Sequence, residues 1–325
     1  MSRLTTGEFQ CRVWHGLIPA VPVPFKAGRQ IDEAAQERFV AYMARQPVAG
    51  VAVWAHTGRG LHLTREQRLQ VLRSWARGLG DKQVIVAGVG GSPEERADFN
   101  SYINSAVAMA EDALENGAQA LMAHPPRLFH HVNDNLNLIV NYHQKLASLG
   151  APLILFYLYE AAGGIPYPPE LLRRLFDLPG VAGIKLATLD SILTFQNVAA
   201  LIARDFPTML VITGEDRFLG YSLMCGAQAA LVGMGAACAG LQEKMMKACY
   251  EGHARKFLEL SRQVDLFSQV TFIPPMEGYI RRMLWALVHL GVLGRESAHD
   301  PWGPELPEEQ FAELGKTLRE LGEIN

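Results

Sequence analysis

Short apolar runs alternate along the chain with longer segments in which apolar and polar residues are mixed. Eight of these runs have the length of a strand, and each is followed by a segment whose apolar residues recur with a helical period. Most runs are apolar throughout rather than at every second position, which indicates strands buried on both faces. The predicted strands are residues 16–23, 50–54, 83–87, 118–123, 152–158, 181–185, 209–213 and 229–233.

Polar residues at the ends of the intervening segments mark where helices begin and stop. Asp32 can cap a helix that extends to about Arg45, and residues 64–67 have the form of a capping box. Asn116-Gly117 is a typical helix stop. After the sixth strand, a helix is expected over residues 190–204.

Alternating strands and helices predict a parallel sheet with right-handed crossovers, and eight such units predict a closed (β/α)8 barrel. An open doubly wound sheet is the alternative. It is disfavoured because no Gly-x-Gly-x-x-Gly motif opens the first turn between strand and helix.

After Ala239 the pattern becomes helical only, with helices expected over residues 241–251, 253–269, 276–290 and 308–321. The chain is therefore expected to consist of an N-terminal segment (1–15), a barrel (16–240) and a C-terminal helical extension (241–325).

Composition narrows the functional classes. The 325 residues are 49% hydrophobic and 19% charged, and the net charge is −3. Neither a nucleic-acid surface nor a membrane surface is expected from this balance. No apolar run is long enough to span a bilayer, and residues 1–15 lack the continuous apolar stretch of a secretory signal. The four cysteines form no paired motif, so the prediction is a cytoplasmic protein.

Lys185 closes the sixth apolar run and is the first candidate for chemistry. Burial disfavours the ammonium form of a lysine and lowers its pKa, which leaves an amine that can form a Schiff base with a ketone. Reactive groups of such barrels gather at the carboxyl ends of the strands. The alternative is a lysine whose stem covers apolar surface while its amine stays in water.

Tyr157 lies at the end of the neighbouring predicted strand, so we expect its phenol to point into the same cavity as Lys185. A phenol beside an amine can carry protons to and from it. Alternatively, Tyr157 is a barrel aromatic whose hydroxyl has a local partner.

The loop after the second strand contains His56-Thr57-Gly58, whose backbone N–H groups and threonine hydroxyl can bind an anion. A turn with a solvated histidine is the alternative. His124, His130 and His131 have no carboxylate or cysteine that would complete a ligand pattern. We therefore expect a surface histidine cluster, no metal and no cofactor.

Several stretches together resemble the dihydrodipicolinate synthase / N-acetylneuraminate lyase family. Tyr157 precedes Lys185 by 28 positions, close to the separation that the family keeps. The other stretches are Ile18-Pro19-Ala20 with Pro24-Phe25, Leu63-Thr64-Arg65-Glu66-Gln67-Arg68, Val86-Ala87-Gly88-Val89-Gly90, Gly183-Ile184-Lys185 and Gly214-Glu215-Asp216.

The resemblance implies a (β/α)8 barrel with a C-terminal helical extension and class I aldolase chemistry. Lys185 would attack the ketone of pyruvate or of a longer 2-oxo acid such as a deoxy sugar acid, and Tyr157 would relay protons. His56-Thr57-Gly58 would hold the substrate carboxylate, and main-chain groups near Val232 and Gly233 would line the pocket. The implied activity is that of a carbon–carbon or carbon–oxygen lyase, and the implied assembly is a homotetramer or dimer.

The chain departs from the family's synthases where the second substrate binds. The family motif G-T-T-G-E is here Ala55-His56-Thr57-Gly58-Arg59, Arg127 follows Pro126 where the family often has a tyrosine, and no arginine follows strand five. His56 could act as an acid–base group, and Arg59 and Arg127 could meet a second anion. Solvated loop residues are the alternative for each.

Three other functions therefore stay open at this point. One is a non-catalytic member that binds a small acid, and another is a condensing enzyme like dihydrodipicolinate synthase. The third is a barrel enzyme without imine chemistry that uses Glu160, His56 or Asp216 as acid–base groups.

Overall fold

The computed structural model describes residues 3–92, 98–189 and 191–325. Within them, eight parallel strands form one sheet in the order β1-β8-β7-β6-β5-β4-β3-β2. A parallel bridge between Ala20 and Ala52 joins the chain beyond β1 to β2 and closes the ring. The predicted (β/α)8 barrel is confirmed, and the alternative prediction of an open doubly wound sheet is wrong.

The strands are β1 Leu17–Pro19, β2 Gly50–Val53, β3 Val84–Val89, β4 Ala120–Ala123, β5 Leu153–Leu158, β6 Val181–Ala187, β7 Leu210–Thr213 and β8 Ala229–Val232. The α-helices are α1 Thr6–Val13, α2 Glu33–Met43, α3 Arg65–Gly78, α4 Phe99–Glu115, α5 Val132–Ala147, α6 Pro169–Phe176, α7 Ile192–Asp205, α8 Leu219–Met224, α9 Ala239–Tyr250, α10 Ala254–Thr271, α11 Tyr279–His289 and α12 Glu308–Glu320. Short 3-10 turns are η1 Arg127–Phe129, η2 Glu160–Ala162, η3 Met234–Ala236, η4 Met276–Gly278 and η5 Arg295–Ser297.

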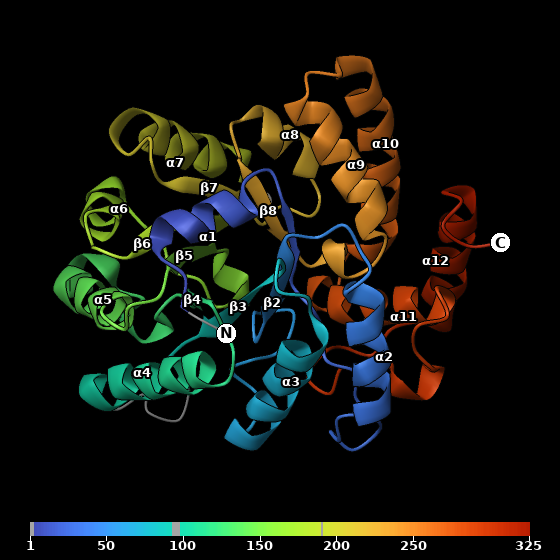
Figure 1. Cartoon of the computed structure of the whole chain (residues 1–325), viewed down its shortest axis with the longest axis horizontal. Coiled ribbons are helices and arrows are strands. Elements are labelled where there is room, and N and C mark those ends of the chain that lie inside the picture. Colours follow the sequence, from blue (N-terminus) through green and yellow to red (C-terminus); the bar gives the residue numbers. More distant parts are fainter. Residues whose placement is uncertain (1–2, 93–97, 190) are drawn as a thin grey trace.

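The helices surround the strands, and α9 to α12 gather on one side of the barrel, coloured orange to red in Figure 1. Asp32 caps α2, and Thr64 with Gln67 forms the expected capping box of α3. The expected start of the helix after β6, Asp190, lies outside the described residues, and Ser191 caps α7. Among the described residues, no helix combines the length and apolar character needed to cross a membrane.

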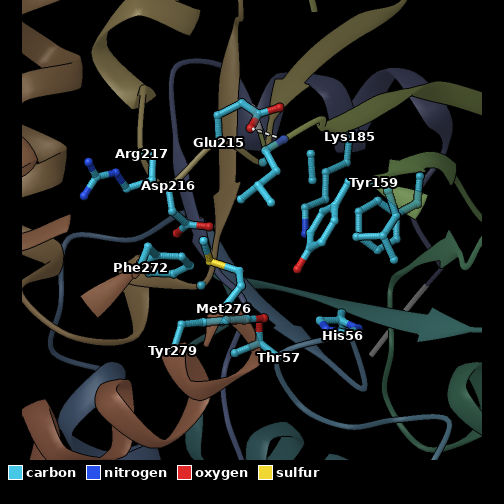
Figure 2. A pocket seen from close by; sticks show the side chains of 16 residues that line it. His56, Thr57, Tyr159, Lys185, Glu215, Asp216, Arg217, Phe272, Met276 and Tyr279 are labelled. Carbon is cyan, nitrogen blue, oxygen red and sulfur yellow. Dashed lines mark hydrogen bonds between the residues drawn. The ribbon is translucent and has the colours of Figure 1, made fainter. Parts of the chain in front are cut away.

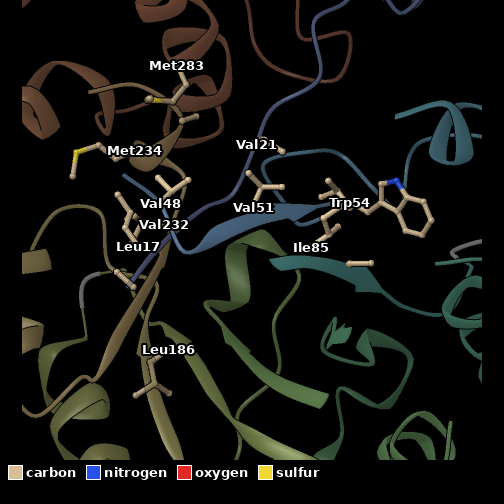
Figure 3. Close-up of a cluster of buried hydrophobic side chains, with 14 of the residues drawn as sticks. Leu17, Val21, Val48, Val51, Trp54, Ile85, Leu186, Val232, Met234 and Met283 are labelled. Carbon is tan, nitrogen blue, oxygen red and sulfur yellow. The ribbon is translucent and has the colours of Figure 1, made fainter. Parts of the chain in front are cut away.

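Two apolar layers make up the core, because successive strand residues point to opposite faces of the sheet. Inside the barrel lie side chains such as Ile154, Phe156 and Ile212. A larger layer fills the space between strands and helices, and Figure 3 shows part of it, including Leu186 and Val232. The face that a residue occupies therefore decides whether it can reach the barrel interior.

A register shift between β5 and β6 determines which side chains share that interior. Leu153 pairs with Val181, but the next residue, Ile154, pairs with Gly183. Ala182 is thus an additional residue in β6, as in a β-bulge. Beyond the shift, Phe156 pairs with Lys185.

The N-terminal segment, for which the sequence predicted no element, contains helix α1. A capping box of Thr5 and Glu8 begins the helix, and Phe9 belongs to the interior apolar cluster. Gln10 donates from Nε2 to the carbonyl oxygens of Ala182 (2.9 Å) and Thr208 (2.8 Å), which lie at the amino ends of β6 and β7. Helix α1 therefore covers the end of the barrel opposite the strand carboxyl ends, and it crosses in front of the strands in Figure 1.

The C-terminal extension folds as the predicted helices, with one difference at its centre. The third helix begins at Tyr279 rather than 276, because residues 276–278 form the turn η4. Arg282 of α11 holds the junction between α10 and α11. Its guanidinium donates to the carbonyl oxygens of Thr271 (3.2 Å), Ile273 (2.8 Å), Pro274 (3.3 Å) and Pro275 (3.4 Å).

Candidate active site

Lys185 points into the barrel near the carboxyl ends of the strands. It lies within β6 rather than at its end, since the strand continues for two residues to Ala187. Only 5% of Lys185 is exposed, and Nζ is 4.3 Å from the centroid of the Phe156 ring. Gly214 leaves room for this side chain, because a Cβ there would lie 2.6 Å from the Lys185 Cε. The alternative of a solvated lysine head does not fit this burial.

Burial lowers the pKa of Lys185 to about 8, while the carboxylates of Asp216 and Glu215 oppose this shift. Burial also raises the pKa of Asp216 to about 7, although the Met234 N–H donates to its Oδ1 at 2.7 Å. The low-dielectric surroundings thus favour the neutral form of both groups. A neutral amine is consequently accessible near neutral pH.

Glu215 stabilises the loop after β6. Its carboxylate accepts hydrogen bonds from the backbone and hydroxyl of Thr188 and from the Leu189 N–H at 3.1 Å. Burial raises the pKa of Glu215 to about 7 despite these bonds. Glu215 and Asp216 thus both line the pocket of Lys185, and the pKa of each carboxyl group is raised to about 7.

Tyr157 does not face Lys185, so the expected placement of its phenol is wrong. Tyr157 pairs with Leu186, and both belong to the layer between strands and helices. Its ring packs edge-on against Tyr167, with centroids 5.6 Å apart. The physical reason is the extra residue at Ala182, since a shift of one residue moves a strand's side chains to the opposite face.

Tyr159 places a phenol in the pocket instead. It follows β5 directly and lines the cavity with Lys185, and Figure 2 shows both side chains entering the same space. Its hydroxyl lies 3.5 Å from the Oε1 of Glu277. Burial, together with the nearby carboxylates of Glu277 and Asp216, raises the pKa of Tyr159 well above its usual value.

The predicted anion loop reaches the pocket in part. His56 and Thr57 line the cavity, and the Thr57 Oγ1 is 2.9 Å from the hydroxyl of Tyr279. Gly58 lies behind them, where a Cβ would be 3.0 Å from the carbonyl oxygen of Val21. Gly233 also lines the pocket.

Val232 faces away from the pocket. Its side chain packs in the layer outside the strands, and its carbonyl oxygen accepts from the Ala20 N–H at 2.9 Å. Neither group of Val232 is therefore placed to line the cavity, and this part of the prediction is wrong.

Arg59 is committed to other protein groups rather than to a second substrate anion. It is 5% exposed, and it donates to both carboxylate oxygens of Asp300, from Nε at 3.1 Å and from Nη2 at 2.7 Å. Nη1 donates to the Oε2 of Glu277 at 2.7 Å. The exposed Arg127 lies beside the turn at Gly163 and does not line the pocket.

Arg217 is the arginine that does line the pocket. It follows Asp216 and is exposed at the rim. Within the part of the chain that the structure describes, Arg217 has no hydrogen bond or ion pair, so its charge is available to a ligand.

The C-terminal extension supplies one wall of the pocket. Phe272, Met276 and Tyr279 line the cavity together with the barrel residues. Phe272 and Tyr279 stack with centroids 4.6 Å apart. Figure 2 shows this wall facing Lys185 across the cavity.

The histidines at the end of β4 do not form one surface cluster. His124 is buried and its Nε2 lies 3.0 Å from the carbonyl oxygen of Trp54, whereas His130 and His131 are exposed. Over residues 3–92, 98–189 and 191–325, no group of three or more His, Cys, Asp or Glu side chains is arranged to hold a metal ion.

The sequence does not indicate that the C-terminal extension lines the pocket or that Tyr159 enters it. Three tyrosines follow closely at 157, 159 and 167, and nothing in the sequence selects Tyr159 among them. From the sequence, Asp216 is only an alternative acid–base group and part of the stretch Gly214-Glu215-Asp216. Glu277 carries no local signal, because its partners His56 and Arg59 lie more than 200 residues earlier in the chain.

Comparison with known proteins gives one consistent result. The model of the dihydrodipicolinate synthetase family matches residues 13–321. An uncharacterized DapA-like lyase of Thermofilum pendens is 24% identical over 95% of this chain and 98% of its own length. The 4-hydroxy-tetrahydrodipicolinate synthase of Archaeoglobus fulgidus is also 24% identical, over 95% and 99%. The fold matches that of YagE, a prophage protein of E. coli K12 solved in complex with pyruvate, with a TM-score of 0.81, 20% identity and coverage of 94% and 98%.

Proposed function

The chain belongs to the dihydrodipicolinate synthetase family and is a lyase of the class I aldolase type, and we propose that it acts on a 2-oxo acid held by Lys185 as an imine. The observation that carries this proposal is the buried amine of Lys185, whose pKa burial lowers to about 8. A neutral amine is the form that attacks a ketone.

The proposed reaction begins when Lys185 Nζ adds to the C2 carbonyl and water leaves, which gives an iminium. In the cleavage direction, the hydroxyl on C4 gives up its proton and the C3–C4 electron pair moves toward the iminium nitrogen. C4 becomes an aldehyde carbonyl, and the resulting enamine is protonated at C3 to give the iminium of pyruvate. Water then hydrolyses this iminium, which releases pyruvate and restores the amine of Lys185. Condensation is the reverse of these steps.

Three pocket residues fit the needs of this chemistry. Thr57 is placed to hold the carboxylate of the substrate, as expected for the loop, with its hydroxyl oriented by Tyr279. Tyr159 takes the proton-relay role expected of Tyr157, because it is the phenol that shares the cavity with Lys185. Gly233 leaves space for the substrate, since a Cβ there would approach Tyr279 and Thr57.

Borohydride trapping tests the proposal directly. Protein mixed with pyruvate and borohydride should gain the mass of one reduced pyruvate, located on the peptide that contains Lys185. Lys185→Ala should lose the adduct and at least about 10³-fold of any turnover. Lys145→Ala, which removes an exposed lysine of α5, is the matched control and should keep both.

The outcome of that experiment separates the competing functions. No adduct with any of a panel of 2-oxo acids would reject the imine mechanism. Full activity of Lys185→Ala would favour a barrel enzyme that uses other acid–base groups. Adduct formation without turnover of any acid would favour a small-acid-binding protein.

We further propose that the substrate is longer than pyruvate and polar at its far end. Besides Lys185, the pocket is lined by the imidazole of His56 and the guanidinium of Arg217, which can meet polar groups that pyruvate lacks. Pyruvate release from deoxy sugar acids and from dicarboxylic 2-oxo acids should be compared in the wild type and in Arg217→Gln. A loss confined to the dicarboxylic acids would assign Arg217 to a second carboxylate, and an equal effect on both classes would reject that role.

A further inference from the structure

Glu277 contacts two side chains that line the pocket, although it comes from the C-terminal extension. It sits in η4, between α10 and α11. Its Oε1 lies 2.9 Å from Nε2 of His56 and 3.5 Å from the Tyr159 hydroxyl. One carboxylate oxygen therefore has both the imidazole and the phenol of the pocket as neighbours.

The other oxygen of Glu277 fixes the carboxylate in place. Oε2 accepts a hydrogen bond from Nη1 of Arg59 at 2.7 Å. Arg59 is itself held by the two-point contact with buried Asp300. A guanidinium bound in this way has a defined plane and direction, so Oε1 is presented to Tyr159 and His56 at a fixed position.

The charge state of Glu277 determines which partner donates. Burial works to raise its pKa, but the hydrogen bond and charge of His56 and the charge of Arg59 lower the pKa to about 2. An ionised carboxylate only accepts hydrogen bonds. His56 must then donate from Nε2, and in its neutral form this leaves Nδ1 as an acceptor for another partner. Tyr159 must direct its hydroxyl proton toward Glu277.

A second aromatic ring from the C-terminal extension lies near that of His56. The ring lies nearly parallel to that of Tyr279, at 25° with centroids 6.5 Å apart. Tyr279 is in turn bonded to Thr57. The imidazole is thus held between the extension and its own loop while it lines the cavity.

We propose that Glu277 is the positioning residue of this site, holding the Tyr159 phenol and the His56 imidazole as two acid–base groups of the pocket. This proposal rests on the imine function described above. In cleavage, Nδ1 of His56 accepts the proton of the C4 hydroxyl while the C3–C4 electron pair passes toward the iminium. In condensation, His56 returns that proton to the new hydroxyl. The Tyr159 hydroxyl serves the proton transfers at the lysine nitrogen and at C3.

Two reactions separate positioning from binding in the Glu277→Gln variant. Borohydride trapping at Lys185 reports whether pyruvate still binds and forms an imine. Exchange of the pyruvate methyl protons with solvent deuterium, followed by NMR, reports proton transfer at C3 without any second substrate. We expect the equilibrium adduct yield to stay within about threefold, while exchange and the kcat of aldol cleavage fall at least about 10²-fold. KM should change much less than kcat.

The controls address folding and charge. Glu305→Gln removes a carboxylate from another arginine pair of the extension, that of Arg281, and should change neither reaction. Glu277→Asp should recover part of the exchange rate. His56→Gln leaves the Glu277–Arg59 pair intact and should lower the cleavage kcat by a similar factor. The double variant of His56 and Glu277 should lose no more cleavage activity than the worse single variant.

Unchanged exchange and kcat in Glu277→Gln would overturn the proposal. So would an adduct yield that falls in parallel with kcat together with a lowered Tm, because that pattern assigns Glu277 to folding of the pocket alone. Absence of any adduct in the wild type would instead reject the imine function itself, so the two failures are distinguishable.

Discussion

Two tyrosines at the end of β5 give a matched pair of single-atom variants. Tyr159→Phe should lower turnover by about 10²- to 10⁴-fold, the range expected when one acid–base group is removed. Tyr157→Phe should leave kcat within about twofold, because its hydroxyl lies outside the barrel, near the backbone of Tyr167. Steady-state kinetics of both variants measure this contrast, and a larger loss in Tyr157→Phe would contradict it.

The buried amine of Lys185 predicts that the rate of adduct trapping depends on pH. With the pKa of Lys185 lowered to about 8, the neutral fraction of the amine rises from about one tenth at pH 7 to about nine tenths at pH 9. The initial rate of adduct trapping at saturating pyruvate should therefore rise about tenfold between these pH values and then level off. A rate that still climbs at pH 10 would mean that the amine titrates like an exposed lysine.

The sequence predicts the placement of a side chain where neighbouring residues in the chain determine it, and fails where distant residues do. Lys185 is identifiable because a lysine that closes an apolar run is unusual in its own right. The expectation for Tyr157 depends on its place at the end of the strand next to that of Lys185, and the sequence does not reveal the additional residue at Ala182. Arg59 looked free to bind an anion because Asp300, its buried partner, lies 241 residues further along the chain.

At the scale of elements, Arg282 holds the α10–α11 junction that carries the pocket wall. Arg282→Met removes a buried donor from several carbonyl oxygens at once. We expect a loss of unfolding free energy of about 3 kcal/mol or more and weaker pyruvate binding. Denaturant unfolding and ligand titration measure the two effects.

Arg319→Met is the control for that variant, since it removes an exposed arginine of α12 from the same extension. Its stability and pyruvate affinity should match those of the wild type. If Arg282→Met binds pyruvate as tightly as the wild type, the α10–α11 junction does not determine the position of the pocket wall.

Element types were predictable where an apolar run or a helical period extends over many residues. Helix ends were predictable where side chains cap them, as at Asp32 and Thr64. The eight-residue helix α1 was missed because so short a helix shows little periodicity and depends on tertiary contacts for its stability. Strand β6 continues past Lys185 because its pairing with β5 extends to Leu158 and Ala187.

At the scale of the whole molecule, α1 and the candidate site lie at opposite ends of the barrel. Phe9 is completely buried in the interior cluster. Phe9→Ala should therefore cost about 3–5 kcal/mol of unfolding free energy and leave kcat within about twofold. Trp14→Ala removes an aromatic that is 52% exposed, and it should cost less than about 1 kcal/mol.

Chemical denaturation and steady-state kinetics of the two variants check this separation. A large fall in kcat for Phe9→Ala, without a change in folded fraction, would show that the two ends of the barrel are coupled.

The whole-molecule architecture was predictable because eight strand–helix units favour the same closed ring. The contribution of the extension to the pocket was not predictable, since no local pattern tells which surface a helix covers. Residues 272–279 reach the site only through long-range contacts such as those of Glu277 with His56 and Arg59.

The pocket wall formed by residues 272–279 has a consequence for how new activities arise on this scaffold. Lys185 and the segment that faces it lie almost 90 residues apart in the chain, so the segment can be varied without changing the lysine. Segment swaps between relatives, or libraries confined to this short stretch that keep Glu277 and Tyr279, would change which substrates are accepted while the proposed proton-transfer groups stay in place. Residues 272–279 of the C-terminal extension are thus the first segment to vary when substrate selectivity is redesigned.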